Sequence, residues 1–167
     1  MTPYVALACL IAAGLTFAVS AWSKARGRAT RAAAADLVRT VTGLSGNRAR
    51  AAAAALIATE AAVPMMLAVP AFRPAGIWLT VGLSAALLGG VLLLAGRDVP
   101  CACFGEPSSR LSGVHAVRNA VLLTVAIGAA CATPSAADTP AGLAAACAGT
   151  VLCLFVIRFE ALHRAFR

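Results

Sequence analysis

Apolar residues gather along the chain into five long runs, which short polar or basic segments separate. Each run is about 17 to 22 residues long, close to the roughly 20 residues that a helix needs to cross the hydrocarbon core of a bilayer. The pattern predicts an all-α polytopic membrane protein, a helix bundle with five transmembrane helices. The predicted spans are residues 3–22, 51–69, 75–96, 114–132 and 141–157.

The first run has a competing interpretation as a cleaved signal peptide, because Ala18 and Ser20 resemble a cleavage site. It has no basic residue before its apolar core and several after it, beginning with Lys24. This order is the reverse of a secretory signal, so a retained span is favoured.

The segment between the first two spans, residues 24–50, is the most basic part of the chain. Within it Leu37, Val38, Val41 and Leu44 recur at helical spacing, and glycines then break the pattern. This predicts a short amphipathic helix between the first two spans. It either lies on the inner membrane surface, with its arginines near anionic lipid, or forms a solvated connection.

Composition and charge support a membrane protein of one domain, residues 1–167. Hydrophobic residues make up 61% of the chain, and the net charge is +8. In a soluble protein that charge would suggest nucleic-acid binding, but here the basic residues flank apolar spans, so the expected partner is the lipid bilayer and no nucleic acid. The predicted outer loops carry only Arg73 among the Lys and Arg, which predicts an N-out, C-in orientation in a cell membrane.

Three polar residues stand out inside the spans: Glu60, Arg118 and Asn119. Glu60 lies in the middle of the second span, where an ionisable group needs a partner, a proton or a hydrated cavity. Arg118 lies about 6 Å into the fourth span, so its side chain either extends back to the interface or reaches inward toward Glu60. Asn119 would help to satisfy such an intramembrane polar cluster.

The loop between the third and fourth spans carries the candidate catalytic residues, Cys101 and Cys103. A disulfide between cysteines at i and i+2 closes a small, strained ring, and strained, exposed disulfides exchange readily with external thiols. Pro100 stiffens the approach to the pair, and Phe104 and Gly105 complete the supporting turn.

Three interpretations of this pair stay open: a redox-active dithiol, a metal site that adds His115 or Glu106, and inert thiols in a structural turn. The spacing matches no strong four-ligand pattern, so no metal is expected. The other four cysteines fall inside or at the edges of spans, where cysteine behaves as a small apolar residue.

Several of these residues together resemble the MauE/DoxX group of redox-associated bacterial membrane proteins, and the MauE branch in particular. The resemblance extends across most of the chain, and a CxCFG loop followed by an Arg-Asn pair is its most specific part. It rests on Ser23-Lys24, Glu60, the loop residues Cys101, Cys103, Phe104 and Gly105, and Arg118-Asn119.

The resemblance implies a DoxX-like four-helix core with one further span. It also implies a role in maturing a disulfide-containing partner enzyme of the methylamine dehydrogenase type, with a thioredoxin-like protein. The chain would then be an accessory thiol–disulfide oxidoreductase. A DoxX-like subunit with a quinone near Glu60 and Arg118, and a non-catalytic scaffold, are the alternatives. Disulfide maturation belongs outside the cytoplasm, whereas the charge distribution places Cys101 and Cys103 inside.

Overall fold

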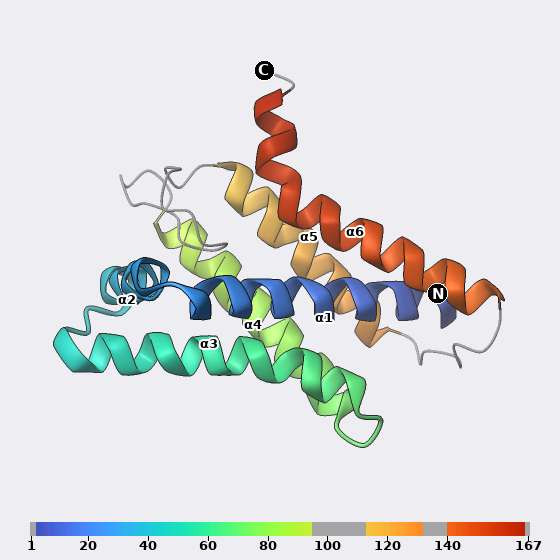
Figure 1. Ribbon diagram of the computed structural model, residues 1–167, viewed down its shortest axis with the longest axis horizontal. Helices are drawn as coiled ribbons and strands as arrows, with labels where there is room; N and C mark the ends of the chain where they lie inside the picture. The colour runs from blue at the N-terminus through green and yellow to red at the C-terminus, as the bar shows by residue number, and fades with distance from the viewer. Residues whose placement is uncertain (1–2, 95–112, 132–139, 166–167) are drawn as a thin grey trace.

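The computed structural model describes the backbone of residues 3–94, 113–131 and 140–165, with the side chains of 3–94, 115–131 and 140–158. These residues form six helices and no strand (Figure 1), which confirms the all-α prediction. The helices are α1 (Pro3–Arg26), α2 (Arg28–Thr42), α3 (Gly46–Ala68), α4 (Arg73–Leu93), α5 (Gly113–Ala130) and α6 (Pro140–Ala165).

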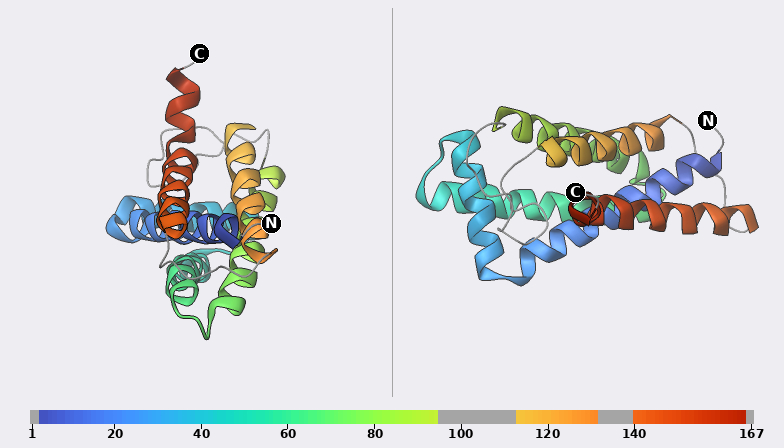
Figure 2. Two further views of the ribbon diagram at one scale, coloured as in Figure 1. Left: turned by 90° about the vertical axis from the view of Figure 1, so that its right-hand side faces the viewer. Right: turned by 90° about the horizontal axis from the view of Figure 1, so that it is seen from above.

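The five long helices run alternately in opposite directions, and α2 lies across one end of them (Figures 1 and 2). We call this the α2 end; α1 and α4 end there, and α3 and α5 begin there. The turn between α3 and α4 lies at the opposite end. α1 is central, because it packs against α2, α3, α5 and α6, while α4 packs against α3 and α5.

Four helices are long and apolar enough to cross a membrane: α1, α3, α4 and the Pro140–Arg158 part of α6. The apolar stretch of α5, His115–Ala130, is shorter. Large apolar side chains face outward, as in a bundle surrounded by lipid. The exposed Trp22 lies near the end of α1 and the exposed Trp78 near the start of α4. The chain is therefore a multi-pass membrane protein.

The helices correspond to the predicted spans, but several ends differ. α1 continues to Arg26 instead of residue 22, α3 begins at Gly46 instead of residue 51, and α6 continues to Ala165. An apolar run marks the part of a helix that suits lipid, whereas the helix itself continues through alanine and arginine, which are good helix formers. α1 ends where Gly27 adopts an extended conformation, with φ −117° and ψ 144°.

The predicted short amphipathic helix is confirmed as α2. It ends at Gly43, whose φ of 72° lies in the left-handed region and whose N–H donates to the Arg39 carbonyl at 2.8 Å. Val38 packs beside α3, and Leu37 packs against the last turn of α4, so α2 is fastened to the bundle. Val41, expected on the same apolar face, is 41% exposed.

Small residues allow the closest helix contacts. A Cβ added at Gly149 of α6 would lie 2.5 Å from the Ala8 carbonyl oxygen of α1, and one at Gly76 of α4 would lie 2.9 Å from the Met66 Cβ. Helices embedded in lipid associate largely through such close packing. A side chain at either glycine would force the helices apart.

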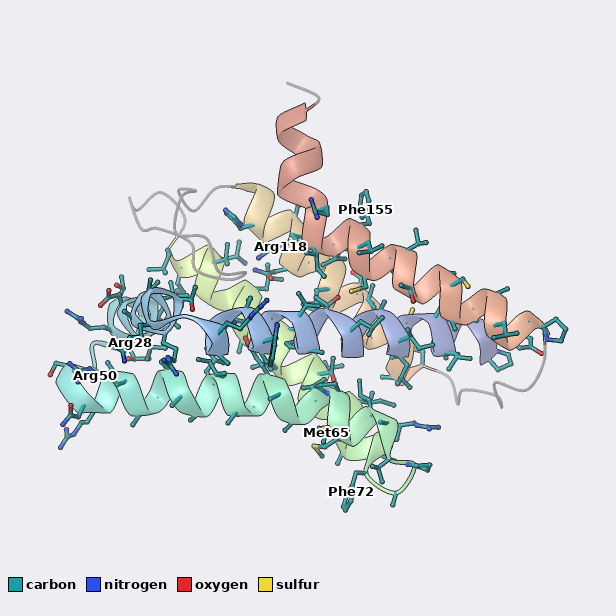
Figure 3. The ribbon with its side chains drawn as sticks, in the orientation of Figure 1. Arg28, Arg50, Met65, Phe72, Arg118 and Phe155 are labelled. Carbon is teal, nitrogen blue, oxygen red and sulfur yellow. The ribbon has the colours of Figure 1, made fainter. Side chains whose placement is uncertain are left out.

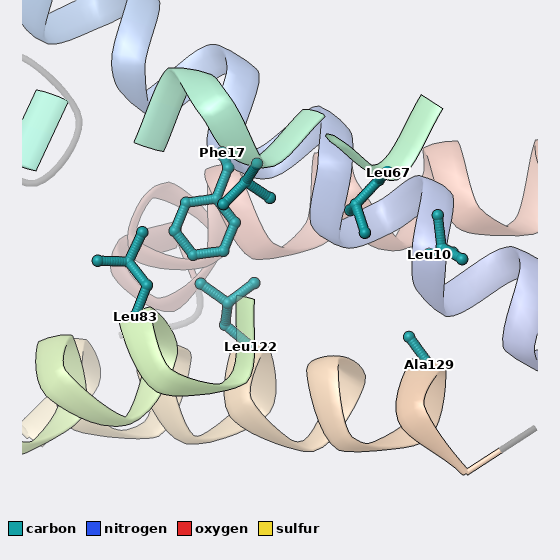
Figure 4. Close-up of a cluster of buried hydrophobic side chains, with 7 residues drawn as sticks. Leu10, Phe17, Leu67, Leu83, Leu122 and Ala129 are labelled. Carbon is teal, nitrogen blue, oxygen red and sulfur yellow. The ribbon is translucent and has the colours of Figure 1, made fainter. Parts of the chain in front are cut away.

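The main apolar core lies where α1, α3, α4 and α5 meet (Figure 4). Phe17 is its largest side chain and is 1% exposed. The cluster consists of Leu10, Phe17, Val63, Leu67, Leu83, Leu122 and Ala129. On the side toward the α2 end it adjoins a group of buried polar residues.

Candidate functional site: a buried polar cluster

Glu60 of α3 is completely buried and forms an ion pair with Lys24 of α1, which is 4% exposed. The Ser20 hydroxyl, one turn before Lys24, donates to the second carboxylate oxygen, Glu60 Oε2, at 3.2 Å. Helical side chains lean toward the N-terminus of their own helix, so on antiparallel helices Lys24 and Glu60 lean toward each other. The pair therefore fastens α1 to α3 inside the bundle.

The expectation that Glu60 needs a partner is confirmed, but sequence reasoning missed Lys24 as that partner. Moving each of the two charges out of water costs several kcal/mol of desolvation free energy. Good ion-pair geometry and further hydrogen bonds offset this cost. A detectable signal was present: Thr16, Ser20 and Lys24 recur every four residues and form a polar stripe on an otherwise apolar helix. All three are buried in the structure.

The first turns of α5 bring a second set of polar side chains to the same region. His115, Arg118 and Asn119 are 2%, 5% and 4% exposed. Arg118 therefore points into the protein instead of extending back to the interface (Figure 3). Ser84 of α4 is also fully buried, and its hydroxyl and the Asn119 Nδ2 have no hydrogen-bond partner among the described residues.

A small cavity of about 20 Å³ connects the two sets. Its polar walls come from Ser20 and Lys24 of α1 and from Arg118 and Asn119 of α5. A polar cavity needs about 10 to 15 Å³ to hold one water molecule, so this one has room for a single water. We call these residues, together with Glu60, the buried polar cluster.

A quinone headgroup does not fit this cavity. Pockets for small molecules typically measure about 300 Å³ or more. Arg118 and Asn119 line the cavity beside Lys24, the ion-pair partner of Glu60, and the cavity has room for a water and not for a ring. As described, the cluster can hold charges and a proton-carrying water and can fix the positions of α1, α3 and α5.

The candidate catalytic pair, Cys101 and Cys103, lies outside the described residues, as do Pro100, Phe104 and Gly105. The helices that flank this segment are placed: α4 ends and α5 begins at the α2 end. The four described cysteines, Cys9, Cys131, Cys147 and Cys153, are free thiols in or next to the apolar helices, as expected.

Comparison with known proteins gives one result. The family described as Methylamine utilisation protein MauE matches residues 2–132, a stretch that includes α1 to α5 and the cysteine pair. Comparisons with curated proteins and with solved structures gave no match. Because the family match covers well over half of the sequence, the chain belongs to the MauE family of membrane proteins linked to methylamine utilisation.

Proposed function

We propose that the protein is an accessory thiol–disulfide relay that matures a disulfide-containing partner redox enzyme through Cys101 and Cys103. Family membership carries the proposal, because the matched stretch includes the cysteine pair and the family is linked to methylamine utilisation. An enzyme of the methylamine dehydrogenase type is the corresponding partner.

The relay step is a disulfide exchange. A thiolate of the partner dithiol attacks one sulfur of the Cys101–Cys103 disulfide, and the other sulfur leaves as a thiolate. The second partner thiolate then resolves the mixed disulfide, so two electrons pass from the partner to the pair. The disulfide of a thioredoxin-like protein takes up these electrons and restores the pair.

The buried polar cluster supports this function as a framework. The Lys24–Glu60 pair fixes α1 against α3, and the buried side chains of Arg118 and Asn119 anchor the first turns of α5 in the bundle. The cysteine segment joins α4 to α5 at this end, so a fixed start of α5 gives the segment a fixed attachment.

The proposed arrangement has five spans, α5 included, with the N-terminus outside and the C-terminus inside. Support comes from the described basic residues between the first two spans: Arg26, Arg28, Arg31, Arg39, Arg48 and Arg50 lie at the end of α1, on α2 and at the start of α3, whereas Arg73 lies at the opposite end. Basic residues are enriched on the cytoplasmic side of membrane proteins. The α2 end, with the ends of the cysteine segment, then faces the cytoplasm.

The relay is tested in cells that express the full chain with its partner enzyme. Cys101→Ser and Cys103→Ser should each abolish formation of the partner's disulfides, measured by thiol trapping and partner activity. Cys147→Ser is the matched control, because Cys147 is an exposed cysteine on α6, far along the chain from the pair. Normal partner maturation with Cys103→Ser would refute the relay.

Sidedness is tested separately with two single-cysteine variants. One keeps only Cys103, and the other keeps only Cys131, which follows α5 at the end opposite α2 and is exposed. A membrane-impermeant maleimide should label Cys131 in intact cells and Cys103 only after permeabilisation. The reverse result would place the relay outside and overturn the N-out, C-in orientation.

A further inference from the structure

An open groove of about 900 Å³ lies between α2 and α3, and Ala25 in the last turn of α1 borders it. Arginines from both helices line one part of it: Arg28, Arg31, Arg39 and Arg50. Figure 3 shows Arg28 and Arg50 at the α2 end of the bundle. Asp36, Gly46, Ile57 and alanines line the rest.

The helical register of α2 and α3 produces this division. On α2, Arg28, Arg31 and Arg39 recur at spacings of three and eight, which place them near one face. On α3, the face that begins with Arg50 continues with residues 53, 54, 57, 58 and 61, all of which line the groove. Because these are alanines apart from Ile57, no large side chain fills the space. Charge therefore lies at one end of the groove and a hollow apolar floor leads away from it.

The apolar floor continues along α3 toward the opposite end of the bundle. A shallower depression shares Ala25, Ile57 and Ala61 with the groove and extends it to Trp22 and Pro64. From Arg50 to Pro64, α3 rises by about 21 Å at 1.5 Å per residue. One leaflet of the hydrocarbon core is about 15 Å thick, half of the roughly 30 Å of a bilayer. The floor is thus long enough for one acyl chain.

Positive charge in the groove exceeds the negative charge available to it. Asp36 is the single acidic residue among the described residues that line it, and it already pairs with Arg39 at 2.6 Å. Arg50 has a long contact of 3.5 Å to the side chain of Asn47, a neutral group. Arg28, Arg31 and Arg50 are exposed, so an anion from outside the protein can reach them.

We propose that this groove binds one anionic glycerophospholipid, with its phosphate held by Arg28, Arg31 and Arg50 and one acyl chain along the alanine floor. Guanidinium groups suit phosphate because they donate two parallel hydrogen bonds to its oxygens. A floor that runs from a basic rim along an apolar membrane span fits a lipid better than an acidic peptide, which would leave the floor uncovered. The site is independent of the thiol relay.

The test measures lipid retention by the full-length protein. Protein purified in a zwitterionic detergent is mixed with phosphatidylglycerol or phosphatidylcholine of the same chain length, and native mass spectrometry counts the lipids bound. We expect about one phosphatidylglycerol per chain and at least tenfold weaker retention of phosphatidylcholine, a difference of about 1.4 kcal/mol. Equal retention of the two lipids would overturn the proposal.

Charge variants identify the headgroup site. The triple variant Arg28→Gln, Arg31→Gln, Arg50→Gln should weaken phosphatidylglycerol retention at least tenfold, to the level of phosphatidylcholine. Arg48→Gln is the control, because Arg48 is an exposed arginine on the same turn of α3 that does not line the groove. If the triple variant and Arg48→Gln lost phosphatidylglycerol retention equally, the lipid would be attracted by the positive surface in general, and a defined site would be refuted.

A second variant tests the floor without changing any charge. Ala58→Phe fills the groove and should reduce phosphatidylglycerol retention, whereas Ala55→Phe, also exposed on α3 but outside the groove, should not. Full retention in Ala58→Phe, together with displacement of the lipid by glycerol phosphate alone, would indicate a phosphate site and refute a lipid site. Thermal unfolding without added lipid should be alike for each variant and its control.

Discussion

Two charged regions of α3 differ in how their charges are matched. Inside the helix bundle, the fully buried Glu60 has both carboxylate oxygens bonded, one to Lys24 and the other to Ser20. Nearer the start of the helix, the exposed Arg50 faces a groove that holds several arginines and one acid. A buried charge must find its partner within the protein, whereas an exposed charge can take one from water or lipid. The first region should therefore control folding, and the second should control binding.

The largest expected effect comes from breaking the buried pair. Glu60→Leu leaves the Lys24 ammonium buried without its carboxylate, which should lower the free energy of unfolding by about 3 to 5 kcal/mol. Denaturant unfolding of the purified protein in mixed micelles measures the change. If Glu60→Leu lowered the free energy of unfolding by no more than the loss of an exposed ion pair does, the assignment of Glu60 and Lys24 to a buried, coupled site would be contradicted.

Removing both charges of the Lys24–Glu60 pair should lower the free energy of unfolding much less than removing one of them. In Lys24→Met with Glu60→Leu no buried charge is left, so most of the stability should return. A double-mutant cycle with both single variants should give a coupling energy of about 1 to 3 kcal/mol. Additive losses would mean that Lys24 and Glu60 contribute independently of each other.

The same comparison explains how far the sequence predicts this protein. Apolar runs located the long helices, and Leu37, Val38 and the glycines after them located α2, because periodicity and turn residues act locally. The partner of Glu60 depends on how α1 is rotated and crosses α3, which no local pattern determines. Arg118 was a reasonable candidate because it also carries a cation within a span. Only the stripe that ends at Lys24 pointed to the observed partner.

The groove was still harder to foresee. The basic segment suggested contact with anionic lipid, but the hollow arises because α2 folds across the end of α3 beside a face of alanines. Alanine spacing alone has no diagnostic value in a chain this rich in alanine. The cysteine pair differs from the groove, because its sequence motif is informative while the pair lies outside the described residues. Its role stays a proposal that the thiol-trapping and labelling experiments test.

An intermediate effect is expected within the cavity of the buried polar cluster. Asn119→Leu removes one polar wall of a space with room for a single water, so it should lower the free energy of unfolding by about 1 to 2 kcal/mol. Thr124→Val is the control, because Thr124 is exposed on the same helix and donates to the carbonyl of Ala120. Greater stability in Asn119→Leu would mean that the Asn119 amide is an unpaired cost and not part of a hydrated network.

The smallest effect on stability is expected at the exposed pair in the groove. Arg39 and Asp36 have side chains that are 60% and 63% exposed, so Asp36→Asn should change the free energy of unfolding by less than about 0.5 kcal/mol. The same change frees Arg39 from its acidic partner, so Arg39 can add its charge to the three arginines that hold the lipid phosphate, and retention of phosphatidylglycerol should rise. Adding Arg39→Gln should reverse that gain, as native mass spectrometry of both variants can measure. If Asp36→Asn destabilised the protein as strongly as Glu60→Leu, burial would not distinguish the two pairs, and the division between a folding region and a binding region would fail.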